Sequence, residues 1–181
     1  VIFQRVAKDL YKYPTSAVRE LLVNAIGHGA KKANVLYGEA NKAYVEVKIH
    51  PHDRSLTITD VRGMGMTYAH IKSLMSFVGR SGNMDSATAG QFGMGYFSYL
   101  KIADSCIVTT KVREPYLYKD KMITGLQFLN NKGWQWQKIN ISDEDIDLEY
   151  PGTRINLTMN EDANIRDVIK TVKEVAKYSD V

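Results

Sequence analysis

The sequence predicts a single α/β domain in which helices pack against a largely antiparallel sheet. Three observations support this fold class. Apolar residues recur at helical spacing near both ends of the chain, in residues 2–26 and 165–178. Between them, two pairs of segments with alternating apolar residues flank short polar turns, which is the pattern of β-hairpins. A chain of 181 residues with 44% hydrophobic residues is also long enough to bury one core.

The composition limits the function classes. The net charge of +4 comes from 24 basic and 20 acidic residues scattered along the chain, so nucleic-acid binding is faintly indicated and not excluded. Cys106 is the only cysteine, which rules out an internal disulfide and fits a reducing compartment. No apolar run reaches membrane-spanning length, so we expect a cytoplasmic protein without a membrane partner. Since Val1 is not an initiator methionine, we expect the chain to be a segment of a longer protein.

The N-terminal part predicts two helices. Residues 2–13 form an amphipathic helix that ends at Pro14. The hydroxyl groups of Thr15 and Ser16 can then cap a second helix over residues 17–33. The apolar face of this second helix consists of Val18, Leu21, Leu22, Ala25 and Ile26.

Glu20 and Asn24 lie one turn apart on the second helix, beside its apolar face. They allow two interpretations: a solvated helix surface, or an oxygen pair that faces a pocket. In the second case the amide of Asn24 could hold a hard cation such as Mg²⁺, and Glu20 could take a proton from water. Gly27 and Gly29 would then loosen the helix end and give a ligand room.

A β-hairpin is predicted from the alternating residues 44–49 and 56–59, which are joined by a polar turn. Its second strand leads directly to Asp60, Gly63 and Gly65. A carboxylate at a strand end can accept a hydrogen bond from an exocyclic amine, and the glycines would let a flat ring approach the backbone. The alternative is a plain turn between a strand and a helix.

Small, polar and glycine-bearing residues from 77 to 91 have the composition of a mobile cover over a site. They lead into Gly90, Gly93 and Gly95, which precede a run of helical period at residues 97–103. Backbone N–H groups and the positive end of the helix dipole would attract a phosphate to this loop. The alternative is a tight connection without a ligand.

The remaining chain predicts further strands and a closing helix. A strand is expected at residues 107–111, and a second hairpin pairs residues 122–128 with 134–139. Another strand covers residues 154–159, and a helix over 165–178 closes the chain.

Four motifs occur in a specific order: E-x-x-x-N on a helix, D followed by G-x-G after a strand, G-x-x-G-x-G before a helix, and a late G-T before a strand. Together they resemble the GHKL superfamily, which includes gyrases, heat-shock chaperones, histidine kinases and MutL. Residues 90–111 are similar to the corresponding segment of the ninety-kilodalton heat-shock chaperones almost position for position. Further similar stretches are RELLVNA at 19–25, GRSG at 79–82 and GTRINLTMNED at 152–162.

The resemblance implies a Bergerat-type ATP-binding fold. This is a two-layer α/β sandwich, with a mixed, mostly antiparallel sheet and helices over one face, and residues 1–181 would form one such domain. The resemblance also implies ATP/ADP and Mg²⁺ as ligands, slow ATP hydrolysis, and closure of the cover as a conformational switch in a larger protein. Downstream domains, a protein client and a nucleotide-dependent homodimer are the partners it suggests. Two other functions fit the superfamily: a scaffold with little catalysis that binds a protein partner, as in anti-sigma factors, and phosphotransfer to histidine.

Carried over by position, the resemblance also assigns roles to residues. It implies that Glu20 activates the attacking water and that Asn24 binds Mg²⁺. Asp60 would accept a hydrogen bond from the adenine amine, and Thr153, beside Asp60, would contact the adenine through a water molecule. The other implied nucleotide-binding residues lie in the adenine pocket, the cover and the phosphate loop: Gly63, Gly65, Met66, Arg80, Ser81, Gly90, Gln91, Phe92, Gly93, Met94 and Gly95. Arg80 takes the place of the usual lid lysine.

The chain departs from the family pattern at two places. Gly27 stands where the chaperones have an aspartate, and the NAIGHG run with His28 resembles the NAxxH pattern of histidine kinases and anti-sigma factors. Asp60 is separated from Gly63 by two residues instead of one, so an ungapped alignment puts Val61 in the aspartate position. One extra residue reverses the facing of side chains, and a local bulge would restore the carboxylate to the pocket.

Overall fold

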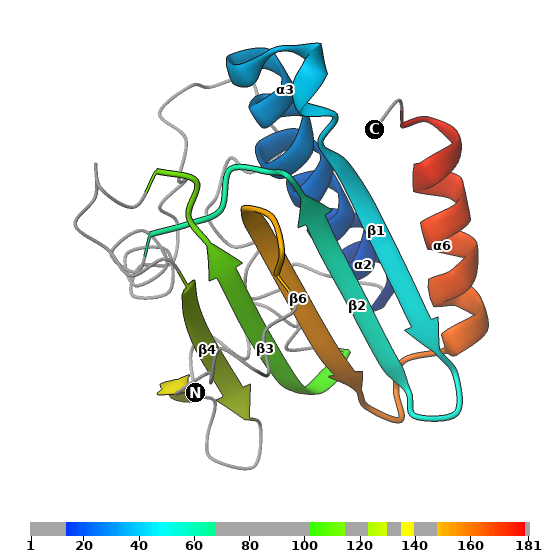
Figure 1. Ribbon diagram of the computed structural model, residues 1–181. Helices are drawn as coiled ribbons and strands as arrows, with labels where there is room; N and C mark the ends of the chain where they lie inside the picture. Colours follow the sequence, from blue (N-terminus) through cyan, green and yellow to red (C-terminus); the bar gives the residue numbers. More distant parts are fainter. Residues whose placement is uncertain (1–13, 68–101, 115–122, 130–134, 140–147, 180–181) are drawn as a thin grey trace.

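The structure is a computed structural model (Figure 1), and it describes residues 14–67, 102–114, 123–129, 135–139 and 148–179. Within these residues, helices cover one face of a six-stranded sheet, which is the predicted α/β sandwich. The helix expected at 2–13, the cover at 77–91 and the phosphate loop at 90–95 all lie outside the described residues.

The strands follow the order β1-β2-β6-β3-β4-β5 across the sheet, and every pairing between these described strands is antiparallel. Both predicted hairpins are present, as β1 with β2 and β4 with β5. The strands are β1 (Tyr44–His50), β2 (Ser55–Val61), β3 (Ala103–Lys111), β4 (Ile123–Leu129), β5 (Gln135–Ile139) and β6 (Gly152–Met159). Because β6 inserts between β2 and β3, the late strand lies at the centre of the sheet (Figure 1).

The helical layer combines an early and a late segment of the chain. Helix α2 runs behind the sheet in Figure 1, and α6 runs alongside β1. The carboxamide of Asn164 accepts hydrogen bonds from the backbone N–H groups of Arg166 (3.0 Å) and Asp167 (3.4 Å), which caps the start of α6. The helical elements are α2 (Pro14–Asn24), η1 (Ala25–Lys31), α3 (Lys32–Tyr37), η2 (Glu39–Asn41) and α6 (Ile165–Lys177).

The core lies between the sheet and the helices. Two rows of buried side chains cross β2, β6 and β3 in register: Leu56, Leu157 and Cys106 form one, and Ile58, Ile155 and Val108 form the next. The predicted apolar face of α2 packs against these rows, together with residues of α6. Each fully buried Leu or Ile contributes roughly 1.5–3 kcal/mol to folding, so these rows hold the layers together.

The second helix extends further than predicted. Instead of loosening at Gly27 and Gly29, it continues through the π-helical turns of η1 into α3 and reaches Tyr37. A Cβ atom at position 29 would lie 2.6 Å from the Cβ of Asp60, so only glycine lets this part of the helix approach the sheet so closely. The helix predicted at residues 97–103 is wrong at its last residue, because Ala103 is the first residue of β3.

Candidate functional site

A polar row replaces the apolar rows at one end of the sheet. Asp60 pairs in register with Thr153, and Thr153 pairs with Thr110 on the next strand. Directly paired residues on adjacent strands point to the same face, and these three continue the alternation of the two core rows. All three are buried, with exposed fractions of 5% for Asp60, 8% for Thr153 and 1% for Thr110. Their burial beside the helical layer marks this end of the sheet as the candidate site, because a buried polar cluster needs a structural or functional partner.

The carboxyl group of Asp60 lies in a cradle of glycines. Oδ1 accepts a 3.1 Å hydrogen bond from the backbone N–H of Thr153. A Cβ atom added at Gly63 would lie 1.8 Å from Oδ1, and one added at Gly29 would lie 2.7 Å from Oδ2. At Gly152, whose φ is +147°, a Cβ atom would lie 1.9 Å from the carbonyl oxygen of Asp60. Glycine at these three positions therefore gives the carboxyl group its space.

The side chain of Asp60, rather than that of Val61, faces the helices. Asp60 contacts the position of Gly29 in η1, and Val61, the next residue of β2, points to the opposite face. The pairing of β2 with β1 and with β6 continues without a shift through Val61. Arg62 follows the strand with a φ of +60°, so the extra residue is accommodated in the turn and not by a bulge within the strand.

Burial raises the pKa of Asp60 well above its ordinary value of 3.8, and the hydrogen bond from the Thr153 backbone acts in the opposite direction. The net direction follows from the loss of hydration, because a charged carboxylate is far more stable in water than in a protein interior. Perturbed carboxyl groups of this kind are concentrated at functional sites, and here the perturbation coincides with the glycine cradle.

Thr110 was not predicted from the sequence as a site residue. Its hydroxyl oxygen accepts a 2.7 Å hydrogen bond from the backbone N–H of Met66, and it lies 3.1 Å from the carbonyl oxygen of Gly152 and 3.2 Å from Oγ1 of Thr153. Thr110 thus connects the segment after Asp60 to the polar row. The alternation of Val108 and Thr110 along the predicted strand was the available signal, since it places a hydroxyl group on the same face as a buried valine.

The segment after β2 approaches the end of β3 closely. Gly65 has a φ of +68°, and a Cβ atom at this position would lie 2.1 Å from the carbonyl oxygen of Lys111. Glycine is therefore needed here both for the backbone conformation and for the close approach. Gly63, Gly65 and Met66, which were predicted together with Asp60, are all brought to the same end of the sheet.

Glu20 and Asn24 form the predicted pair on α2. Nδ2 of Asn24 donates a 3.5 Å hydrogen bond to Oε1 of Glu20, and both residues are half-buried. Burial raises the pKa of Glu20 above its ordinary value of 4.5, while the hydrogen bond from Asn24 lowers it. Gly29 follows Asn24 on the same continuous helix, in the π-helical turns of η1. The helix therefore links the Glu20 and Asn24 pair to the cradle of Asp60.

The remaining predicted site residues belong to the cover and the phosphate loop. They lie outside the described residues: Arg80, Ser81, Gly90, Gln91, Phe92, Gly93, Met94 and Gly95. The structure thus brings together Asp60, Thr153 and the glycine turn, and it connects them through one helix to the Glu20 and Asn24 pair.

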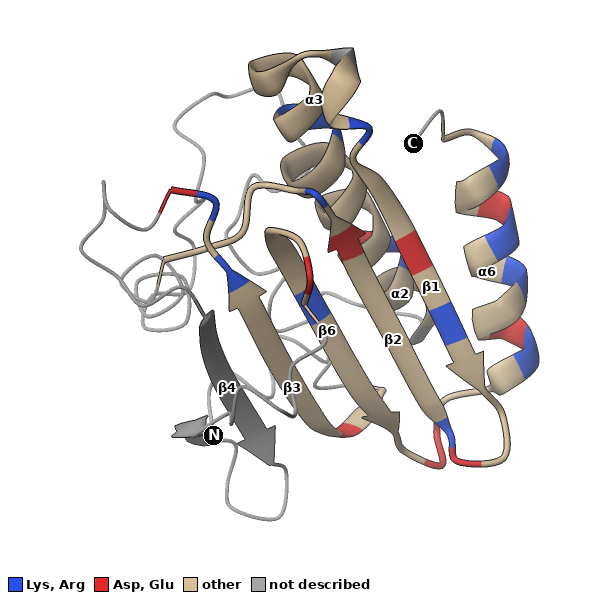
Figure 2. Cartoon of the chain, viewed as in Figure 1, with Lys and Arg blue, Asp and Glu red and all other residues tan. Residues whose placement is uncertain are grey.

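Charges are unevenly distributed over the described residues. Basic and acidic residues are interspersed along α6, whereas few positions on strands β1, β2, β3 and β6 are charged (Figure 2). No helix in the described part of the chain has both the length and the hydrophobicity to cross a membrane. Nor do three or more histidine, cysteine, aspartate or glutamate side chains gather there as potential metal ligands.

Comparisons with known proteins give a consistent result. The family model described as histidine kinase-, DNA gyrase B- and HSP90-like ATPase matches residues 11–151. The chaperone protein HtpG of Idiomarina loihiensis is 29% identical over 177 residues, covering 86% of this chain and 26% of the relative. HtpG of Halalkalibacterium halodurans is 24% identical over 204 residues, covering 99% of this chain and 30% of the relative. HtpG of Vibrio atlanticus is 28% identical over 201 residues, covering 95% of this chain and 28% of the relative. The chain thus spans less than a third of the length of each of these relatives.

Proposed function

Because the chain belongs to the histidine kinase-, DNA gyrase B- and HSP90-like ATPase family, we propose that it binds ATP with Mg²⁺ and hydrolyses it slowly. The observation that supports this proposal best is the buried carboxyl group of Asp60, held by Thr153 and surrounded by glycines. Closure of the cover at residues 77–91 over the nucleotide would convert binding into a conformational switch.

In this proposal Asp60 recognises the purine. A carboxyl oxygen in the cradle can accept a hydrogen bond from the exocyclic amine of adenine, which guanine does not present at the same ring position. The hydroxyl group of Thr153 lies on the same face of the sheet and offers a second polar contact. Gly63 and Gly65 leave space for a flat ring beside the backbone, because neither has a side chain to fill it.

The residues present fit a magnesium ion. With Nδ2 of Asn24 turned toward Glu20, the carbonyl oxygen of the same amide is directed away from Glu20. Mg²⁺ prefers oxygen ligands and is held by one or two protein oxygens together with phosphates and water, so a single amide oxygen is sufficient. Asn24 would be the protein ligand, and the ion would neutralise charge on the phosphates when bound.

Glu20 would orient and deprotonate the water that attacks the terminal phosphate. Its raised pKa suits this role, since a stronger base accepts a proton more readily. Asn24 holds the carboxylate in place through its hydrogen bond. Phosphoryl transfer also needs positive charge at the terminal phosphate, and Arg80 is the candidate within this chain. We therefore propose slow turnover, with additional help from other parts of a longer protein.

The role of the switch in a larger protein is part of the proposal. The relatives are chaperones, and by analogy this domain would act on a protein client through downstream domains and a nucleotide-dependent homodimer. A second candidate function is a scaffold for a protein partner. The exposed apolar side chains of Val35 and Leu36 on α3, with exposed fractions of 83% and 59%, support it because large apolar residues at a surface often belong to interfaces.

Calorimetry with ATP and GTP, each with and without Mg²⁺, distinguishes the two functions. Adenine-selective, magnesium-dependent binding is the expected result. Equal affinity for ATP and GTP would contradict the role of Asp60, and absence of binding to either nucleotide would favour the scaffold.

A further inference from the structure

The turn between Asp60 and Met66 is held by a side chain from another part of the chain. Arg113 follows β3, and its Nε and Nη2 atoms each donate a 3.3 Å hydrogen bond to the carbonyl oxygen of Gly63. Nη2 also donates to the carbonyl oxygen of Arg62. The backbone N–H of Arg113 reaches the carbonyl oxygen of Met64 at 3.4 Å. Three successive carbonyl groups of the turn are therefore bound by one residue.

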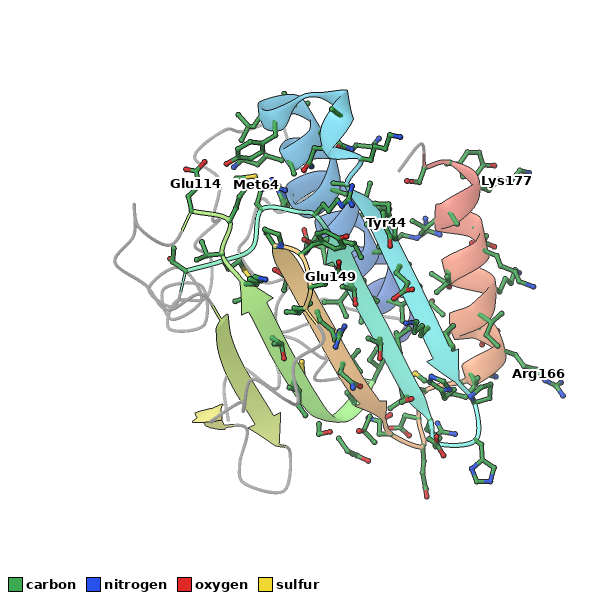
Figure 3. All side chains as sticks on the ribbon, in the orientation of Figure 1. Tyr44, Met64, Glu114, Glu149, Arg166 and Lys177 are labelled. Carbon is green, nitrogen blue, oxygen red and sulfur yellow. The ribbon has the colours of Figure 1, made fainter. Side chains whose placement is uncertain are left out.

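The guanidinium group of Arg113 is itself fixed from two sides. Nη2 donates a 2.9 Å hydrogen bond to Oδ1 of Asn41, and the carbon Cζ lies 4.3 Å from the centre of the Tyr37 ring. The hydroxyl group of Tyr37 donates a 2.9 Å hydrogen bond to Oε1 of Glu114. Figure 3 shows Met64 and Glu114 close together beside α3. The planar guanidinium group spreads its donors over separate nitrogens in a fixed geometry, whereas the donors of a lysine all lie on one nitrogen.

Asn41 extends the same network to the helical layer. Its Nδ2 donates to the carbonyl oxygen of Arg62 at 3.0 Å and to Oδ1 of Asn34 at 3.3 Å. Asn34, on α3, exchanges hydrogen bonds with the backbone of Ala43, at 2.8 Å to its N–H and 3.0 Å to its carbonyl oxygen. The turn is thus tied to α3 as well as to the end of β3.

The position of this turn sets the space around Asp60. Gly63 is so close to the carboxyl group that an added Cβ atom would lie 1.8 Å from Oδ1. Arg62 adopts a φ of +60°, a conformation that is costly for a residue with a side chain and persists only when surrounding contacts hold it. Without Arg113, the carbonyl groups of Arg62 and Gly63 would lose their charged donor, and the turn would be free to relax away from Asp60.

We propose that Arg113 is a positioning residue of the nucleotide site: by holding the carbonyl groups of residues 62–64, it keeps the glycine turn against Asp60 and so sets the affinity and selectivity for adenine. This inference rests on the proposed function. Arg113 acts through the turn and does not contact the nucleotide.

The test compares the affinities of the 181-residue chain for ATP and GTP by calorimetry with those of Arg113→Ala and Arg113→Lys. Loss of the charged hydrogen bonds should weaken ATP binding roughly tenfold in Arg113→Ala and reduce the preference for ATP over GTP. Arg113→Lys keeps the charge and should give an intermediate loss. Arg166→Ala is the matched control, because Arg166 projects from α6 into solvent (Figure 3). This variant should bind both nucleotides as the unmodified chain does.

A merely structural role gives a different result. Partial unfolding lowers the number of binding-competent molecules equally for both nucleotides, so the ratio of the two dissociation constants stays unchanged. An unchanged ratio in both variants would overturn the inference. If Arg113→Ala does not fold, the ratio measured for Arg113→Lys decides. An unmodified chain that binds neither nucleotide would instead reject the proposed function, and this inference with it.

Discussion

The backbone N–H of Thr153 donates a 3.1 Å hydrogen bond to the side chain of Asp60, although the two residues are 93 positions apart in the sequence. The bond joins the end of β2 to the start of β6, where the two residues also pair in register. It occupies one carboxyl oxygen, Oδ1, and thereby fixes the orientation of the other. A carboxyl group fixed in this way can discriminate between ligands, because it cannot rotate to suit a different pattern of donors.

Replacement of Asp60 by asparagine should weaken ATP binding by at least about tenfold, because the new amide presents a donor where adenine also presents one. Selectivity for ATP over GTP should fall as well. Asp162→Asn, in the exposed turn after β6, changes the net charge equally and is the control. Calorimetry on both variants checks the prediction. Unaltered ATP affinity in Asp60→Asn would contradict the role of Asp60 in purine recognition.

The same substitution should change how stability depends on pH. Burial raises the pKa of Asp60, so the folded chain keeps this proton to a higher pH than the unfolded chain. The stabilisation is complete below the ordinary value of 3.8 and is lost as the pH rises through the folded-state pKa. Asp60→Asn does not titrate, so its free energy of unfolding should rise relative to that of the unmodified chain above about pH 4, by at most about 1.4 kcal/mol per pH unit.

Urea denaturation at a series of pH values measures this difference. Because the ordinary carboxyl groups titrate in both chains, only the difference between the two curves reports Asp60. Parallel curves between about pH 4 and pH 7 would show that the pKa of Asp60 is not raised.

Much of the fold could be predicted because its signals are local. The alternation in residues 44–49 and 56–59 predicts both strands of the first hairpin, and the helical spacing of Val18, Leu21 and Leu22 predicts the face that is buried. The sequence predicted that the second helix loosens at Gly27 and Gly29, because glycine is usually a sign of a helix end, but the helix continues through both residues. Here a long-range contact with Asp60 determines the outcome, and a local pattern cannot reveal it.

The candidate site could be predicted only in part for the same reason. Its acidic residue and glycines belong to a recognisable motif, and the structure places Asp60, Gly63 and Gly65 together. Whether Asp60 or Val61 faces the helices depends on where the extra residue is accommodated, which the backbone at Arg62 determines. Thr110 and Arg113 contribute through contacts with distant backbone groups and belong to no motif. Such contacts require the register of β6 and β3, which a single sequence does not give.

Alanine at Gly63 should abolish ATP binding and destabilise the fold. The new methyl group would lie 1.8 Å from Oδ1 of Asp60, so the carboxyl group or the turn must move, at a cost of about 2 kcal/mol or more. Gly27→Ala is the matched control, since a Cβ atom there meets nothing within 4 Å. On a helix this control should be neutral or more stable by up to about 1 kcal/mol. Chemical denaturation and calorimetry test both variants, and equal stability of the two would contradict the close packing described here.

Alanine at Glu20 should leave ATP affinity within about threefold of the original and reduce turnover on the order of 100-fold, because a general base contributes to the chemical step and little to binding. Glu174→Gln is a suitable control: it removes another carboxylate of the helical layer, one that forms an exposed 3.2 Å ion pair with Arg19 and contributes at most about 1 kcal/mol. Steady-state hydrolysis and calorimetry measure the two effects separately. Unchanged turnover in Glu20→Ala would reject the assignment of the base.

The pH dependence of hydrolysis gives an independent check on Glu20. The base must be ionised to accept a proton, and burial raises its pKa above 4.5. The acid limb of kcat/KM, which reports the free enzyme, should therefore have its midpoint above pH 4.5. Glu20→Gln should remove this limb and leave a low rate that no longer falls in the same pH range, because glutamine keeps the shape of the side chain but does not titrate. An acid limb that persists unchanged in Glu20→Gln would assign the titration to another group.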